Sequence, residues 1–312
     1  MSDTIADVSE APAVTRSTLA HWACAAIGVA AALLGLLPWL GTGMRLPLQN
    51  LWAVSTMPED MPLVALPFSQ YYLSQLFGLL VTGSVVAGIA ARATRARLPR
   101  GGFGLLVFGL LIIQVGATAQ SAVTVRAGLQ DRTESTLYLV VVVAVCALSI
   151  AVGAGVVALV ARAPRAGALL GLTIGSLAAG AWLSAVLRPL TMMSSEGAYA
   201  IVTAVQWVPP VLVGVAIAWA GLNTVGRVVA ALASLVLLWI VPALITGVTS
   251  AAGSRVLAHE PQQMIEYAVQ VFSAALLLPE LAMPPVLVAV VVAAMGLGVR
   301  WVVARRRSRA QL

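Results

Sequence analysis

Eight stretches of this sequence carry no charged side chain, and each is about as long as a membrane-spanning helix. Such a helix needs about 20 mostly apolar residues, because the hydrocarbon core is roughly 30 Å thick and a helix rises about 1.5 Å per residue. Apolar residues make up 61% of the 312 positions and charged residues 9%. The sequence therefore predicts an all-α, polytopic membrane helix bundle with one transmembrane domain over 19–304. The expected spans are about 19–40, 71–91, 103–122, 137–160, 167–187, 199–220, 229–249 and 284–304.

The basic residues are distributed unequally between the two sides that these spans define. All 18 are arginines, which is typical of a GC-rich bacterial genome. If the N-terminus is cytoplasmic, 13 of the 18 fall on the cytoplasmic side, where basic residues are retained. We therefore expect a bacterial cytoplasmic-membrane protein with a polar tail at 1–18 and a basic tail at 305–312, both cytoplasmic. Anionic lipids of the inner leaflet account for the basic side, so no nucleic-acid partner is expected.

The fifth expected span carries small residues at every fourth position, namely Gly167, Gly171, Gly175 and Ala179. Small side chains let helix backbones approach closely in lipid, where no hydrophobic force drives helices together. This stripe predicts a helix-packing face and a central position for the fifth span in the bundle.

Prolines interrupt two neighbouring spans near their middles. The sixth contains Gln206, Pro209 and Pro210 in "QWVPP", and the seventh contains Pro242. Proline removes a helical hydrogen bond, and transporters often build a midplane site from broken helices. We interpret these residues, together with Gln114 in the third span, as substrate-pathway candidates. The alternative is that the prolines only shape the bundle and Gln114 only bonds a neighbouring helix.

The last outer connection contains an amphipathic segment at about 260–278. Glu266 and Gln270 belong to its polar side, and apolar residues cover the opposite side. Two placements follow from this pattern. The favoured one is an interfacial helix lying flat on the outer leaflet, and the alternative is a re-entrant helix whose polar side lines a cavity.

The first outer connection contains the acidic pair Glu59 and Asp60 in "PEDMP". An acidic pair in the first outer loop of a polytopic envelope protein is similar to a feature of the membrane glycosyltransferases that use polyprenyl-phosphate sugars. That resemblance consists of these two residues alone and implies that one of them acts as general base or metal ligand. The alternative is a solvated turn between two helices.

Few other residues suggest chemistry. The only histidines are His21 and His259, Cys24 and Cys146 lie in apolar stretches, and no phosphate-binding loop motif occurs. We expect no cofactor and no metal, and any ATPase would be a separate partner subunit. No ionisable residue lies at the centre of a span, where ion couplers usually place one.

Three functions fit this pattern. The favoured one is a permease-like protein, or an accessory membrane subunit of a transport or envelope complex, for a small or lipidic substrate. The alternatives are an envelope glycosyltransferase that uses the outer-loop carboxylates and a non-catalytic scaffold that binds other membrane proteins.

Overall fold

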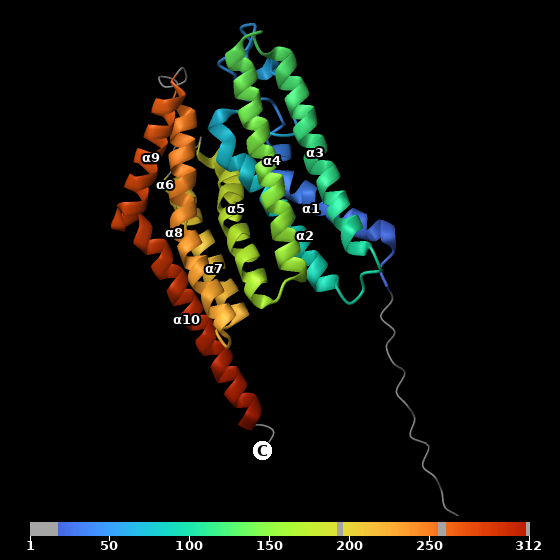
Figure 1. Cartoon of the computed structure of the whole chain (residues 1–312), viewed down its shortest axis with the longest axis vertical. Coiled ribbons are helices and arrows are strands. Elements are labelled where there is room, and N and C mark those ends of the chain that lie inside the picture. Colours follow the sequence, from blue (N-terminus) through green and yellow to red (C-terminus); the bar gives the residue numbers. More distant parts are fainter. Residues whose placement is uncertain (1–17, 192–195, 255–259, 310–312) are drawn as a thin grey trace, which may run out of the picture.

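The computed structural model describes residues 18–191, 196–254 and 260–309. Within these ranges the regular structure is entirely helical, and eight helices are long and apolar enough to cross a membrane. The predicted all-α polytopic bundle is therefore confirmed. The elements (Figure 1) are α1 (His21–Gly41), the 3₁₀ turns η1 (Pro58–Asp60) and η2 (Gln70–Tyr72), α2 (Leu73–Thr94), α3 (Gly102–Gly128), α4 (Thr133–Arg162), α5 (Arg165–Thr191), α6 (Glu196–Val205), α7 (Val208–Ala220), α8 (Val225–Gly253), α9 (Pro261–Leu277) and α10 (Pro279–Arg309).

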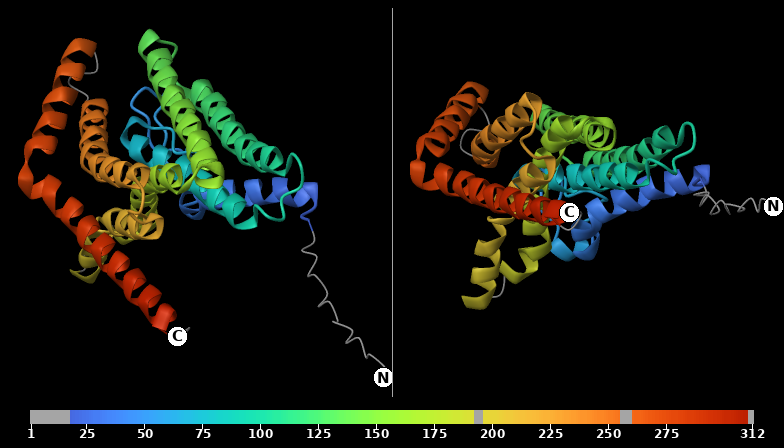
Figure 2. Two further views of the ribbon diagram at one scale, coloured as in Figure 1. Left: turned by 60° about the horizontal axis from the view of Figure 1, so that its bottom comes forward. Right: turned by 90° about the horizontal axis from the view of Figure 1, so that it is seen from below.

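Helix α5 lies between two groups of helices (Figures 1 and 2). Helices α1 to α4 pack together on one side of it, and α7 to α10 pack together on the other. The stripe of small residues lies where α5 contacts the first group. A Cβ on Gly175 would lie 2.4 Å from Val85 of α2, and one on Gly171 would lie 2.9 Å from Val160 of α4. Glycine is needed at these positions because any side chain would push the helices apart.

The turns that carry most of the arginines lie at one end of the bundle, which is called the basic end below. Arg92 at the end of α2 donates to the carbonyls of Val160 (2.6 Å) and Ala163 (3.2 Å), at the end of α4. Arg300 of α10 donates to the carbonyl of Trp219 (2.9 Å), at the end of α7. Four helices therefore end on the same side of the bundle, as alternating spans require. They are α2, α4, α7 and, with its last turns, α10.

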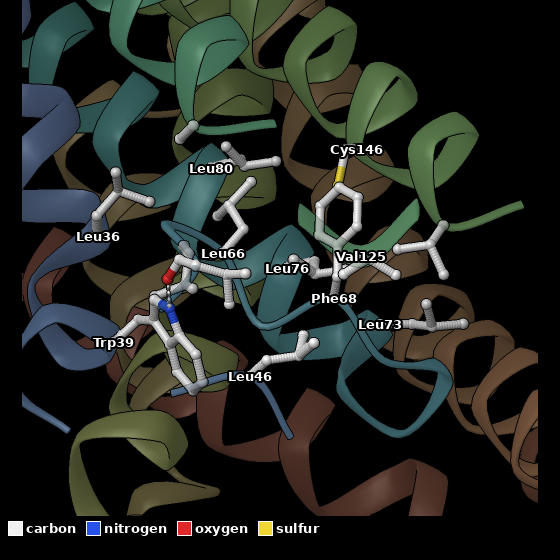
Figure 3. Close-up of a cluster of buried hydrophobic side chains, with 14 of the residues drawn as sticks. Leu36, Trp39, Leu46, Leu66, Phe68, Leu73, Leu76, Leu80, Val125 and Cys146 are labelled. Atoms are coloured by element: carbon white, nitrogen blue, oxygen red, sulfur yellow. Dashed lines mark hydrogen bonds between the residues drawn. The ribbon is translucent and has the colours of Figure 1, made fainter. Parts of the chain in front are cut away.

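Part of the connection between α1 and α2, residues 42–69, folds into the opposite end of the bundle (Figure 3), and another part pairs with the backbone at the end of α3 through Leu51 and Ala53. Leu46, Met61, Leu66 and Phe68 are each at most 2% exposed. They pack with residues of α1 to α4, among them Cys146, in one apolar cluster. The sequence analysis treated this connection as an outer loop and did not predict its burial.

Side chains from α1 and α3 satisfy the backbone of this buried segment. Trp39 donates from Nε1 to the carbonyl of Val64 (2.8 Å, Figure 3). The amide of Ala65 donates to Gln120 Oε1 (2.8 Å), and the amide of Leu66 donates to Ser121 Oγ (2.9 Å). Non-helical backbone is tolerated at membrane depth only where protein supplies such partners. These polar side chains of α1 and α3 therefore allow an extended segment to enter the bundle.

We expect Leu66→Ala to destabilise the protein by about 2–5 kcal/mol, because the leucine is fully buried in the cluster and its removal leaves a cavity. Leu48→Ala is the matched control, since Leu48 lies in the same connection but is 54% exposed. Thermal unfolding in detergent micelles measures both. Equal losses for the two variants would show that the connection is not part of the core.

Candidate functional site

Two of the helical segments that run back toward the basic end are broken. Gln206 and Trp207 separate α6 from α7, and Leu278 separates α9 from α10. Helix α7 has 13 residues, so it is roughly 20 Å long. The break at Gln206 therefore lies about 20 Å from the basic end, within the depth of a hydrocarbon core of roughly 30 Å.

Helix α9 lies along α8 (Figure 1), and α10, which follows it, is by itself long enough to cross a membrane. A Cβ on Gly247 of α8 would lie 2.7 Å from the carbonyl oxygen of Ala268 of α9. Farther along, Trp239 donates from Nε1 to the carbonyl of Leu276 (3.1 Å). Because Trp239 is in the middle of α8, α9 ends near the mid-depth of the bundle. Ala268 and Phe272 of α9 pack against α8, while Ile265 and Val269 are 66% and 57% exposed. The interfacial and re-entrant placements of this helix both stay predictions.

The halves nearer the basic end, α7 and α10, run parallel and in close contact. A Cβ on Gly214 of α7 would lie 2.6 Å from the carbonyl oxygen of Ala289 of α10. One on Gly296 would lie 2.5 Å from the Cβ of Ala218. Both glycines let the two backbones approach in a way that larger side chains would prevent.

These parallel helices also share a sequence. "PPVLV" occurs at Pro209–Val213 and again at Pro284–Val288, and nine of fourteen positions are identical between 209–222 and 284–297. Gly214 and Ala289, which meet at the contact, occupy equivalent positions of the two copies. The sequence analysis missed this repeat, although the pentapeptide was visible in two of the charge-free stretches.

The helices that precede the broken ones are paired in the same parallel way. Helices α5 and α8 both start at the basic end, and the hydroxyls of Thr173 in α5 and Ser234 in α8 lie 2.8 Å apart. Helix α6 contacts α5, as α9 contacts α8. The hairpins α5–α7 and α8–α10 thus share a parallel arrangement. Gln206 and Trp207 interrupt the first just before Pro209, and Leu278 interrupts the second six residues before Pro284. Corresponding broken segments in two halves are the strongest sequence-level indication of a transporter binding site.

The remaining pathway candidates of this region lie at different places around the two hairpins. Among the described residues, they do not line one common cavity. Gln206 is exposed at its break, and Pro210 is buried. A Cβ on Gly180 of α5 would lie 2.6 Å from Pro209. In the second hairpin, Pro242 is exposed on α8, and both Glu266 and Gln270 are exposed on α9.

Gln114 lies in the first group, apart from both breaks. Its side chain is 1% exposed, and Nε2 donates to the carbonyl of Leu80 (2.7 Å) and to Ser84 Oγ (3.3 Å). It therefore connects α3 to α2 at mid-depth, which matches the role of interhelical bond that was the alternative to a pathway role.

The acidic pair lies on the surface. Glu59 and Asp60 are both exposed in η1, which Pro58 begins. Among the described residues, no three His, Cys, Asp or Glu side chains are placed to hold a metal ion. Comparisons with protein-family models, with curated proteins and with solved structures give no match.

We expect Gly214→Ala to destabilise the protein, because the new methyl would meet the Ala289 carbonyl and force α7 from α10. Gly298→Ala in α10 is the matched control, since nothing lies within 4 Å of its Cβ position. Helix propensity alone favours alanine by about 0.5–1 kcal/mol, so the control should be neutral or more stable. Melting temperatures in detergent compare the two, and a stabilised Gly214→Ala protein would contradict the close contact.

Proposed function

We propose that this protein is permease-like and that a small or lipidic substrate crosses beside the breaks of the two repeated hairpins. The observation that supports the proposal is the pair of parallel segments, α5–α7 and α8–α10, in which one break precedes α7 and another precedes α10. Transporters of this kind bind substrate at the interface between repeats, where discontinuous helices offer unpaired backbone groups.

The residues at the breaks favour a neutral or weakly polar substrate group. The exposed amide of Gln206 can both donate and accept a hydrogen bond at the first break. Around it the chain offers prolines and aliphatic residues, and no span carries an ionisable side chain at its centre. A binding site of this composition recognises substrates by shape and a few hydrogen bonds.

The membrane placement follows from the arginines. We assign the basic end to the cytoplasmic side of a bacterial cytoplasmic membrane, which places both termini inside. Arg92 and Arg300 then lie at the inner leaflet, where anionic lipids attract them by about 1 kcal/mol each. An ATPase that drives transport would be a separate subunit docked at this end.

A second function, that of an accessory subunit, is favoured by the exposed polar side of α9. Gln263, Glu266 and Gln270 are all exposed, although α9 lies along the outer half of α8. Polar side chains that face lipid at this depth are costly and usually bond another helix. A partner membrane protein would cover this side.

Aqueous access to Gln206 tests the pathway. We expect Gln206→Cys to react with a membrane-impermeant maleimide in intact membranes, because a substrate pathway admits water to mid-depth. Ile112→Cys on α3 is the control; Ile112 is 52% exposed and faces away from the hairpins. The native Cys24 and Cys146 are buried and supply an unreactive background. Failure of Gln206→Cys to react from either side would remove the midplane pathway.

The accessory function predicts a specific neighbour at α9. A photo-crosslinking amino acid in place of Gln270 should give one discrete protein adduct in native membranes. The same group at Val123 of α3, which is 71% exposed, should react with lipid only. Lipid adducts alone at position 270, or the same protein adduct at both positions, would argue against a partner at this surface.

A further inference from the structure

A hollow of about 300 Å³ opens at the turn between α3 and α4, in the first group of helices and away from the repeated hairpins. The polar residues that line it include Arg126 at the end of α3, Asp131 in the turn and Ser135 in the first turn of α4. Gln130 holds the turn in place, since its side chain donates to the carbonyl of Trp52 (3.1 Å). The hollow thus carries one basic group, one acidic group, the side-chain amide of Gln130 and the hydroxyls of Ser135 and Thr136.

The hydroxyl of Ser135 has no hydrogen-bond partner among the described residues, although the side chain is only 3% exposed. A buried polar group without a partner costs roughly 1–3 kcal/mol, and native proteins rarely leave one unexplained. Ser135 lines the hollow with its hydroxyl oxygen buried, so a ligand bound there supplies the missing hydrogen bond after a rotation about the Cα–Cβ bond.

The start of α4 adds a positive field to the same place. Helix α4 is 30 residues long, and its N-cap residue Arg132 makes no side-chain capping bond. The first amides of such a helix point outward without intrahelical partners and attract anions. Arg126 lines the hollow as well and can bind phosphate oxygens through two N–H groups. Glu134 of the first turn is exposed and is not part of the lining.

Asp131 adds a negative charge to the hollow, so the hollow also favours a cationic group on the ligand. Its carboxylate lines the hollow with Arg126, so an ammonium group on the ligand would find a partner there. A ligand with a phosphate and an ammonium a few bonds apart satisfies Arg126, Ser135, the α4 amides and Asp131 together. A purely anionic ligand would place its negative charge beside the Asp131 carboxylate, which would repel it.

The depth of the hollow indicates where such a ligand comes from. Ser135 lies 27 residues before Arg162 at the basic end, roughly 40 Å along α4. That exceeds the roughly 30 Å hydrocarbon core and reaches the headgroup region of the far leaflet. Trp52 packs against Gly128 beside the hollow, and tryptophan is enriched at this interface.

We propose that this hollow binds a phosphoethanolamine group, the zwitterionic headgroup of a phospholipid in the outer leaflet. Arg126, Ser135 and the first turn of α4 hold the phosphate, and Asp131 holds the ammonium. The site is independent of the pathway proposed above, since it belongs to the other group of helices.

Calorimetric titration of the purified full-length protein with dihexanoyl phosphatidylethanolamine tests the site, with O-phosphoethanolamine and dihexanoyl phosphatidylglycerol as parallel titrants. We expect the ethanolamine lipid to bind and the glycerol lipid to bind at least tenfold more weakly. Equal binding of O-phosphoethanolamine would identify a free solute as the ligand, and binding of the lipid alone would identify a headgroup. No heat from either ethanolamine compound would overturn the proposal.

Three variants assign the groups. Arg126→Gln should weaken binding about tenfold or more, and Ser135→Ala should weaken it by a smaller factor, as expected for bonds to a charged group. Asp131→Asn should abolish the preference for ethanolamine over glycerol lipid. Arg132→Gln is the matched control, since Arg132 belongs to the same turn but not to the lining. An equal loss in Arg132→Gln, or unchanged binding in both Arg126→Gln and Ser135→Ala, would refute the site.

Discussion

In a hydrocarbon environment, every backbone amide and carbonyl must find a partner within the protein, and this requirement underlies each unusual feature of the bundle. Most of the chain meets it with continuous helices. The connection between α1 and α2 meets it with side chains, because Trp39, Gln120 and Ser121 bond the backbone at Val64, Ala65 and Leu66. An apolar segment without secondary structure can therefore occupy the core of the first group of helices.

The same requirement explains why the broken helices break as they do. At each break the chain resumes a helix within a few residues, so only helix ends are left without intrahelical partners. The halves nearer the basic end are held together by the contacts of Gly214 and Gly296. Among the described residues, the main contacts of α6 are with α5, and those of α9 are with α8 and α10.

The two groups of helices differ in how their polar residues are used. In the first group Gln114 and Gln120 are committed to structural bonds, and the charged side chains around the hollow lie at the turn between α3 and α4. In the second group Gln206, Glu266 and Gln270 are exposed. Helix α5 contacts both groups, and its glycines bring it close to the first. The first group therefore has continuous helices joined by buried hydrogen bonds, whereas the second has segmented helices with exposed polar side chains.

The sequence by itself determined the class, the number of crossings and the shared side of the basic turns, because span length and charge distribution depend only on local composition. It also contained the "PPVLV" repeat, although two pentapeptides become meaningful only when α7 and α10 are seen side by side. Tertiary structure alone decided that Leu46, Met61, Leu66 and Phe68 enter the core, that α9 lies along α8 and that Ser135 lines a hollow. Each of these depends on contacts between residues far apart in the chain, and no local pattern of hydropathy records which partner will supply a hydrogen bond.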